Sequence, residues 1–370
     1  MKLDFIGSLL TEAADAGPRI PHPEDAIFDG VAAAQKYLNG MKEVIAKPQT
    51  NTIKWDGFIA LFFGYDPSGK FFISDKYMYP AGFYAHSPAD WERYDTEIKS
   101  SKKERGDLYP KIAAIWEGLQ AAVTARAVFK GDLMAIGTDQ MTPRDGVFAF
   151  QNVTVTYKIP VDSAMGQAMK NKVAMIVVHS MNDKPWNVKT GLANKGNVAI
   201  IGPMGLPAGQ ASKPFTLDNP VQLVKTAEAM LKSKGPLAEK FLKGLDGVSQ
   251  AKIKTYFNKK ITGQTKENLD AWLVNPESNT KPPTVKKLVG DNRGGYLYRE
   301  HAGYDALTKV WNAIYQLKNN LAAQLEPQVT GFAQEVNGQL QGEGFVANTK
   351  SAGTVKLVNR GVFGGAHFNK

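Results

Sequence analysis

One short run of the sequence places a potential nucleophile beside a carboxylate and a turn residue: Lys54, Trp55, Asp56 and Gly57. A lysine attacks an electrophile only when its amine is neutral, which desolvation or a neighbouring cation can bring about. Lys54 stands in an aromatic, β-branched stretch, so aromatic neighbours at a strand end would supply the desolvation. Asp56 and the turn at Gly57 would orient groups beside the amine.

Four later motifs carry the other charged residues that phosphate chemistry needs. An amine that attacks a triphosphate needs cations at the α-phosphate and carboxylates that can bind Mg²⁺. Lys76 and Lys356 are the candidate cations, and Asp132 and Glu343 are the candidate carboxylates. Taken singly, each has an ordinary structural explanation as a solvent-facing lysine or a turn residue. Their motifs, in chain order, are SDK (74–76), KGDL (130–133), GEGFV (342–346) and VKLV (355–358).

In this order, the motifs resemble those of the covalent nucleotidyltransferase superfamily of DNA ligases, RNA ligases and messenger-RNA capping enzymes. KWDG matches the signature K-x-D-G, whose lysine takes AMP or GMP as a phosphoramidate. The resemblance implies that Lys54 is the catalytic residue and that Asp132 and Glu343 also bind the metal, Mg²⁺. With ATP as the nucleotide, the binding residues that it implies are Asp56, Gly57, Lys76, Asp132, His179, Glu343 and Lys356.

His179 ends the apolar run AMIVVH and has two explanations. In ligases an aromatic residue near the corresponding strand stacks on the base, and the resemblance gives His179 this role. A half-buried histidine with satisfied hydrogen bonds accounts for the same residue equally well.

A closer resemblance is to a family of ligase-like proteins encoded by tailed phages, over about 1–185 and 340–370. The superfamily pattern implies an ATP-dependent polynucleotide ligase that acts through lysyl-AMP, and we expect a monomer in the cytoplasm of an infected bacterial host. The alternatives are another nucleotidyltransferase, either capping-type or protein-modifying, and a non-catalytic nucleic-acid-binding protein with a degenerate ligase core. The segments that carry this resemblance are HPEDAIFDG, KWDGFIALFFGYDPSGKFFISDK, FKGDLM, FAFQNVTVTYKIPVDS, VVHS, EGFV and VKLVNRGVF.

The sequence also departs from the ligase pattern. Thr52 stands where many ligases have an acid that reads the adenine amino group, so ATP and GTP both stay open. Asp132 is shorter than the usual glutamate, and about 160 residues separate VVHS from EGFV. The short stretch after Lys356 predicts no C-terminal OB-fold, which is more typical of RNA ligases than of DNA ligases, although both substrates stay open.

The elements that must position these residues predict an α+β fold. We expect a nucleotidyltransferase core of antiparallel sheets, like the ATP-grasp-like adenylation domain of ligases, over 51–204 and 336–370. A helical segment should occupy 1–50, with a helix over 21–41 that ends near Gly40, and a helical insertion should occupy 205–335. Further expected elements are strands at 52–65 and 70–76, a helix at 111–125, helices at 220–233, 236–244, 248–258 and 304–325, a loop at 275–292, and C-terminal strands that rejoin the first sheet.

Most of the net charge of +10 lies in the predicted insertion. Residues 211–290 contain fourteen lysines, no arginine and seven acids, a local balance of 14 − 7 = +7. Such a block is typical of a surface that binds a polyanion, so nicked or single-stranded nucleic acid is the expected partner. A solvated lysine-rich helical surface explains the charge as well.

Composition excludes several classes of site and protein. The chain has no cysteine, which rules out disulfides, cysteine-bound zinc, iron–sulfur clusters and thiol catalysis. Its five histidines are scattered and form no metal-binding pair at helical spacing. No run approaches the roughly 18 apolar residues that a membrane helix needs. The first residues lack a long apolar core and carry acids early, so no secretory signal is expected.

Overall fold

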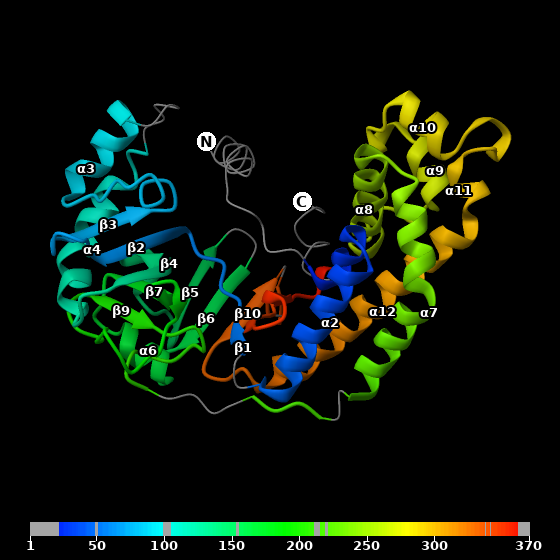
Figure 1. Cartoon of the computed structure of the whole chain (residues 1–370). Helices are drawn as coiled ribbons and strands as arrows, with labels where there is room; N and C mark the ends of the chain where they lie inside the picture. Colours follow the sequence, from blue (N-terminus) through cyan, green and yellow to red (C-terminus); the bar gives the residue numbers. More distant parts are fainter. Residues whose placement is uncertain are drawn as a thin grey trace.

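A computed structural model describes residues 22–48, 51–98, 105–152, 155–210, 215–218, 221–336, 338–340 and 342–361. Within these ranges the fold is mixed α and β, with three sheets beside a helical region (Figure 1). All strand pairs are antiparallel except the parallel pair of β7 and β9. The expected combination of antiparallel sheets and helices is therefore confirmed.

The largest sheet has one face buried under helices and a second face on which buried apolar residues such as Met175 and Val177 lie beside polar ones. Leu61, Phe63 and Phe129 point to the buried face, where they share a hydrophobic cluster with Trp91 of α3 (Pro88–Arg93) and Ile112 of α4 (Tyr109–Ala122). The intervening residues must point to the other face, because side chains alternate along a strand. The strand order is β3-β2-β4-β7-β8, with β9 also beside β7. The strands are β2 (Ile59–Tyr65), β3 (Phe71–Asp75), β4 (Val128–Ile136), β7 (Ala174–Met181), β8 (Lys184–Pro185) and β9 (Val198–Ile201).

Two smaller sheets join segments that lie far apart in the chain. In the first, of order β1-β12-β13, the C-terminal strands pair with β1 (Asn51–Ile53), the strand directly before Lys54. In the second, of order β11-β10-β6-β5, β10 pairs with β6. Their strands are β12 (Phe345–Thr349), β13 (Gly353–Leu357), β5 (Val147–Asn152), β6 (Val155–Pro160), β10 (Ala333–Val336) and β11 (Gln339–Leu340).

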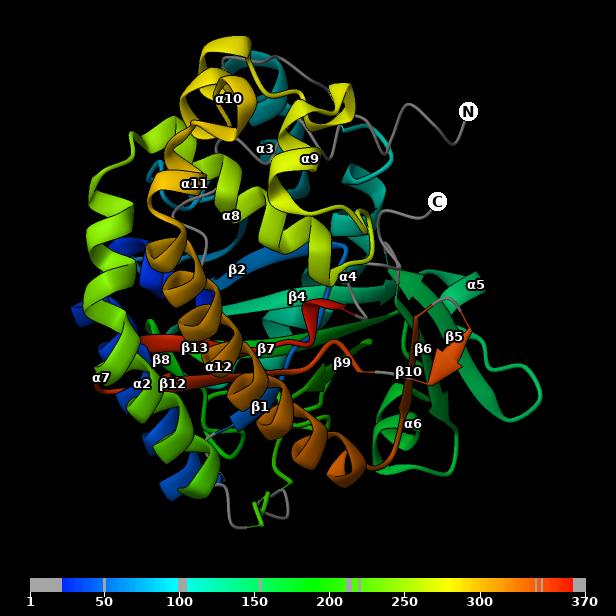
Figure 2. The ribbon, with the colours of Figure 1, turned by 90° about the vertical axis from the view of Figure 1, so that its right-hand side faces the viewer.

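The helical region contains most of the chain between β9 and β10. Figure 2 shows the long helices α7 (Val221–Lys243) and α12 (His301–Leu325) beside each other, with α2 (Val31–Ala46) against α7. Shorter helices α8 (Gly247–Ile261), α9 (Leu269–Val274), α10 (Pro282–Leu288) and α11 (Tyr296–Arg299) lie toward one end (Figure 1). The remaining short helices are η2 (Pro23–Asp29), η4 (Tyr94–Ile98), α5 (Thr138–Met141), α6 (Ala164–Met169), η5 (Pro276–Ser278), η6 (Asp291–Arg293) and η7 (Glu326–Gln328).

Tertiary packing overrides several local predictions. The two helices expected at 220–233 and 236–244 form one helix, α7, with Pro236 inside it. Buried Leu231 and Phe241 flank this proline, so burial outweighs the hydrogen bond that proline cannot donate. Gly40 does not end a helix but lies inside α2, where a Cβ would stand 2.8 Å from the Cβ of Ala352. The stretch 275–292 is largely helical rather than a loop.

Two predictions about strands were also wrong. The strand expected at 52–65 is broken, because β1 ends at Ile53 and β2 begins at Ile59. The C-terminal strands pair with β1 in a sheet of their own and do not join β2 and β3.

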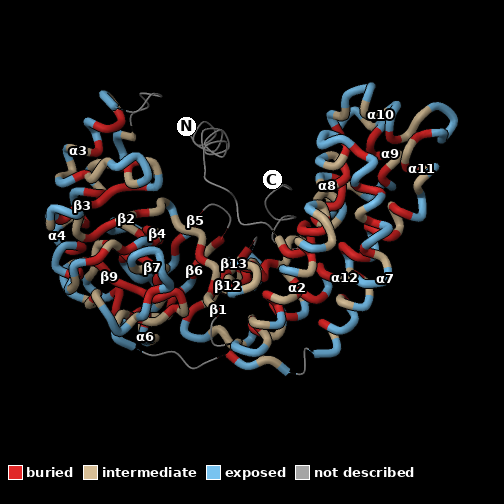
Figure 3. Tube along the Cα trace, in the orientation of Figure 1, coloured by how far each residue is buried: buried red, intermediate tan, exposed pale blue. Residues whose placement is uncertain are grey.

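Buried side chains run from the helices into the smaller sheets (Figure 3). One hydrophobic cluster contains Leu38 of α2, Leu231 of α7, Ile314 of α12, Phe345 of β12 and Tyr157 of β6. The N-terminal segment and the helical region therefore share one core with the sheets. Among the described helices, none has the length and apolar character needed to cross a membrane.

Candidate active site

The KWDG motif lies in the irregular segment between two sheets. The N–H of Lys54 donates to the carbonyl of Gly344, beside β12, at 2.8 Å. The N–H of Phe58 donates to the carbonyl of Leu133, in β4, at 2.8 Å. Residues 54–58 thus cross from the three-stranded sheet to the six-stranded sheet, and Lys54 lies where the two sheets meet.

Glu343 approaches Lys54 from the C-terminal part of the chain. Its carboxylate forms an ion pair with the Lys54 ammonium, and its side chain has no exposed surface, whereas 22% of the Lys54 side chain is exposed. The glycine that follows Glu343 is required by the backbone. Gly344 has φ 101°, and a Cβ there would lie 2.3 Å from the carbonyl oxygen of Leu357.

Asp132 approaches the same segment from the second face of the six-stranded sheet. It lies in β4 opposite Ala60, and a Cβ at Gly57 would lie 2.4 Å from the Cβ of Asp132. Glycine at position 57 therefore lets the KWDG segment pass directly over Asp132. His179 Nε2 lies 3.0 Å from Asp132 Oδ2, so this half-buried histidine has a carboxylate partner, as the structural explanation of His179 requires.

The charges around Lys54 shift the protonation equilibria of the site. Burial by itself would lower the pKa of Lys54, but the carboxylates of Glu343, Asp56 and Asp132 outweigh burial, and the pKa is raised. Burial raises the pKa of Glu343 to about 7, although the charge of Lys54 opposes this shift. Three carboxylates thus surround one amine, and the Lys54 side chain is held as an ammonium.

The two remaining candidate cations lie at the margins of this group. Asp75 ends β3 opposite Leu61 of β2, so Lys76 lies level with Ala60 of β2. Ala60 in turn lies opposite Asp132 of β4, which places Lys76 two strands, or about 10 Å, from Asp132. Lys76 is exposed, and its ammonium lies 4.9 Å from the centre of the Tyr77 ring. Lys356 is half-buried in β13 opposite Val346, in the sheet whose first strand leads into Lys54.

Two residues that sequence analysis missed hold the site together. Tyr157 donates a hydrogen bond of 2.7 Å to Glu343 Oε1 and accepts one of 3.0 Å from the N–H of Asp56. Gln334 donates to the carbonyl of Lys54 and accepts from the N–H of Glu343. Tyr157 lies in the segment FAFQNVTVTYKIPVDS and Gln334 in none of the quoted segments, but neither role could be predicted, because both depend on strand pairing between distant segments.

The carboxylates near Lys54 are of the kind that a hard divalent cation needs, but both oxygens of Glu343 are already bonded, one to Lys54 and one to Tyr157. Carboxylate oxygens are the ligands that Mg²⁺ prefers, and Asp132 and Glu343 bring them from two different sheets. Their excess of negative charge over the single lysine also favours a cation. Within the described part of the chain, no three acidic or histidine side chains converge closely enough to form a metal site by themselves.

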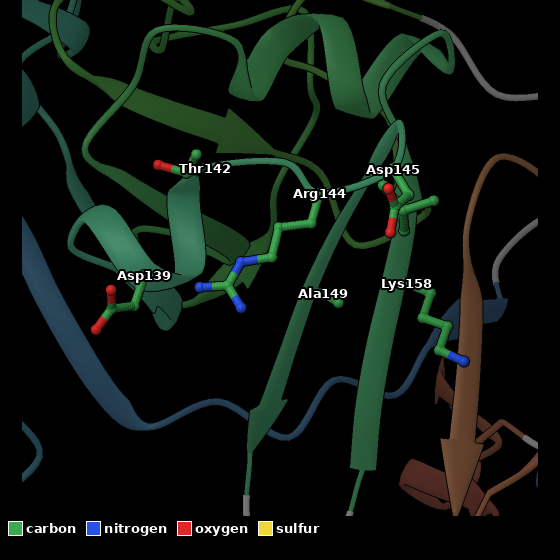
Figure 4. A pocket seen from close by; sticks show the side chains of 7 residues that line it. Asp139, Thr142, Arg144, Asp145, Ala149 and Lys158 are labelled. Carbon is green, nitrogen blue, oxygen red and sulfur yellow. The ribbon is translucent and has the colours of Figure 1, made fainter.

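A polar hollow elsewhere on the surface does not belong to this group. Figure 4 shows Arg144 and Lys158 at its edge, together with Asp139 and Asp145, along β5 and β6. The hollow has a volume of about 680 Å³ and contains none of the candidate residues. Lys158 also pairs with Glu335 at 2.7 Å.

Comparison with known proteins adds a family but no activity. No curated protein matches the chain, and no solved structure matches it. Residues 19–370 match a family described as a family of unknown function, DUF6267. Because this match covers both the KWDG segment and the C-terminal strands that meet it, the chain belongs to the DUF6267 family.

Proposed function

We propose that this protein is an ATP-dependent polynucleotide ligase that acts through a covalent lysyl-AMP intermediate at Lys54. One observation carries the proposal: Lys54 meets Glu343, from a motif 289 residues later in the chain, with Asp132 of a third motif beside the same segment. These are the residues that the resemblance to covalent nucleotidyltransferases assigns to one reaction. An incidental surface lysine would not have carboxylates from two distant parts of the fold, Glu343 and Asp132, beside its own Asp56.

The reaction begins with deprotonation of Lys54. Its ammonium contacts Glu343, whose pKa is raised to about 7 by burial, so Glu343 is the nearest group that can accept a proton at neutral pH. The neutral amine attacks the α-phosphorus of ATP, a P–N bond forms, and the bond to pyrophosphate breaks. The second proton leaves the new P–N nitrogen for solvent.

Two transfers complete strand sealing. A 5′-phosphate oxygen attacks the phosphorus of lysyl-AMP, the P–N bond breaks, and Glu343 gives its proton back to the leaving nitrogen, which restores the amine of Lys54. A 3′-hydroxyl then attacks the 5′-phosphorus and loses its proton to solvent, a phosphodiester bond forms, and AMP leaves. Lys76 and Lys356 would bind phosphate during these steps. Asp132 would hold Mg²⁺, which neutralises phosphate charge when it is bound, whereas the oxygens of Glu343 are bonded to Lys54 and Tyr157.

The helical region supports a nucleic-acid partner. Nine of the described lysines between residues 221 and 290 are exposed, so they can contact phosphates without reading sequence. Two of them pair with acids, Lys243 with Glu239 at 2.7 Å and Lys287 with Asp246 at 2.6 Å. These exposed lysines are Lys225, Lys232, Lys240, Lys243, Lys260, Lys266, Lys281, Lys286 and Lys287.

The test is covalent labelling with nucleotide. The protein is incubated with Mg²⁺ and either α-labelled ATP or α-labelled GTP, and is then separated by denaturing electrophoresis. We expect an acid-labile labelled band from ATP that is lost in Lys54→Ala, followed by sealing of nicked DNA or RNA. Labelling of Lys54→Ala at the wild-type level would refute the assignment of Lys54.

The same experiment separates the alternatives. A band from GTP alone would indicate a capping-type guanylyltransferase. A band from ATP without sealing of any nucleic acid would indicate a protein-modifying or other nucleotidyltransferase. No band from either nucleotide, in protein with intact circular dichroism, would leave a nucleic-acid-binding protein with an inactive ligase core.

A further inference from the structure

We infer that Tyr157 and Gln334 are the positioning residues that hold Lys54 and Glu343 in register. The inference rests on the proposed function for its catalytic meaning, and its geometry stands independently. The two residues are direct cross-strand partners, Gln334 in β10 and Tyr157 in β6. Both are buried, so neither has solvent as an alternative partner.

Tyr157 joins the two halves of the site through one hydroxyl group. The hydroxyl donates to Glu343 Oε1 at 2.7 Å, while the other oxygen of Glu343 faces the Lys54 ammonium. The same hydroxyl accepts the N–H of Asp56 at 3.0 Å. Because one oxygen of Glu343 is held by Tyr157, the carboxylate cannot rotate away from the lysine without breaking a buried hydrogen bond.

Gln334 makes the corresponding connection through the main chain. Its amide nitrogen donates to the carbonyl of Lys54 at 3.4 Å, and its amide oxygen accepts the N–H of Glu343 at 3.3 Å. One side chain thus spans both segments at the residues that bear the reacting amine and the carboxylate. The cross-strand pair therefore fixes the Lys54 and Glu343 backbones at the same point.

A column of aromatic rings makes this support rigid. Tyr157 stacks on Trp55 with ring centres 5.5 Å apart, and on Phe150 at 5.3 Å. Trp55 stacks in turn on Phe332 at 4.7 Å, and its indole N–H donates to the carbonyl of Pro203 at 3.1 Å. The tryptophan of KWDG is therefore an anchor that presses the segment onto Tyr157, and the tyrosine ring has little freedom to move.

The consequence for the reaction is a pre-aligned amine. A displacement of about 1 Å at a reacting group can cost on the order of 100-fold in rate. Tyr157 and Gln334 act through Glu343 and the main chain of Lys54 and Asp56, so their loss should impair the chemical step and leave ATP binding intact.

The experiment compares Tyr157→Phe and Gln334→Met with Tyr256→Phe. Tyr256 is a matched control because it is a buried tyrosine whose hydroxyl donates to a backbone carbonyl, that of Glu267, in the helical region. The first readout is transfer of α-labelled AMP to the protein across a range of ATP concentrations. We expect the saturating rate to fall roughly tenfold or more in both site variants. The half-saturating ATP concentration should stay within about twofold of the wild type.

The second readout needs no nucleotide. The wild type and each variant are treated briefly with acetic anhydride at one pH, and mass spectrometry compares acetylation of Lys54 with that of exposed Lys76. In Tyr157→Phe we expect Lys54 to react about threefold faster or more, because Glu343 is no longer fixed against its ammonium. Tyr256→Phe should match the wild type in both readouts.

The two readouts keep the inference separate from the proposed function. If the wild type forms no lysyl-AMP, the ligase proposal fails, and acetylation of Lys54 still decides whether Tyr157 positions the pair. The inference is overturned if Tyr157→Phe and Gln334→Met behave like Tyr256→Phe in acetylation and AMP transfer. A change in half-saturating ATP concentration with an unchanged saturating rate would also overturn it. If Tyr157→Phe does not fold, Gln334→Met decides alone.

Discussion

Two lysine–glutamate pairs in this protein have the same chemistry and opposite surroundings. Lys54 pairs with Glu343 between two sheets, and Lys318 of α12 pairs with Glu24 of η2, where Nζ and Oε1 are 2.5 Å apart. Neither glutamate side chain has exposed surface. Lys54 keeps 22% of its side chain exposed and Lys318 keeps none, so only Lys54 can meet a ligand from solvent.

The two lysine–glutamate pairs also differ in the charges around them. Beside Lys318, Arg360 contacts Glu24 at 2.7 Å and Asp25 at 2.8 Å, and Lys254 lies 3.8 Å from Asp25, so three cations face two carboxylates. Burial lowers the pKa of Lys318 to about 8, even with Glu24 beside it. The pKa of Lys54 is raised instead, because three carboxylates outweigh the effect of burial.

The difference separates a structural ion pair from a candidate reactive one. The Lys318 cluster is closed and has no excess of negative charge, and it joins η2, α12 and the segment after β13. The Lys54 group is open and carries two more carboxylates than amines, a charge that a bound cation would balance. A buried ion pair is therefore weak evidence of function by itself, and access together with charge excess gives the stronger indication.

The largest expected contrast is in AMP transfer. Glu343→Gln should lower the rate of lysyl-AMP formation about 100-fold or more, because the amide cannot accept the proton of Lys54. Glu24→Gln should retain the wild-type rate, per folded molecule, within about twofold. The measurement is labelling by α-labelled ATP, corrected for the native fraction seen by circular dichroism. Equal losses in the two variants would remove the distinction between the pairs.

In the free energy of unfolding, Glu24→Gln should have the larger effect and Glu343→Gln the smaller one. Glu24→Gln leaves a buried lysine and arginine short of one counter-charge and should lower the free energy of unfolding by about 3–5 kcal/mol. Glu343→Gln should change it by less than about 1 kcal/mol, since Asp56 and Asp132 still face Lys54 and the amide still accepts from Tyr157. Urea unfolding at pH 7 measures both values. A loss in Glu343→Gln as large as that in Glu24→Gln would make Glu343 a structural residue.

A smaller effect is expected from a substitution at Gly57, which packs closely against Asp132. Gly57→Ala would place a Cβ 2.4 Å from the Cβ of Asp132, so the KWDG segment must shift. We expect a loss of about 1–3 kcal/mol in the free energy of unfolding. Gly247→Ala is the matched control, because a Cβ there meets nothing within 4 Å and the residue begins α8. If both variants unfold at the same urea concentration, the packing of Gly57 on Asp132 is not tight.

The smallest effect concerns acid sensitivity beside the closed cluster. Burial first, and then the charges of Arg360 and Lys318, lower the pKa of His22 to about 2. Below about pH 6.5 the unfolded chain therefore binds a proton at His22 that the folded chain does not bind. Because of His22, the free energy of unfolding should fall by about 1.4 kcal/mol per pH unit as the pH drops from 6.5.

Replacement of this histidine isolates its contribution. His22→Gln should flatten the acid side of a stability profile measured by urea unfolding at pH 7, 6 and 5. His301→Gln, at an exposed position in α12, is the control and should leave the profile as in the wild type. An unchanged slope in His22→Gln would assign the acid sensitivity to other groups.

Local patterns in the sequence determined much of this protein. Helical periodicity predicted the region between β9 and β10 as helical, and the run 111–125 corresponds closely to α4. The resemblance of KWDG, KGDL and GEGFV to nucleotidyltransferase motifs pointed to Lys54, Asp132 and Glu343. These features could be predicted because periodicity and turn chemistry depend on neighbouring residues.

Tertiary structure decided the rest. The break of the expected strand at 54–58 follows from hydrogen bonds to Gly344 and Leu133, which lie in two different sheets. Tyr157 and Gln334 became part of the site only through the pairing of β6 with β10. Such pairings join segments more than 170 residues apart, as the register of Tyr157 with Gln334 shows. Their free energy comes from burial and hydrogen bonds between distant residues, which no local pattern encodes.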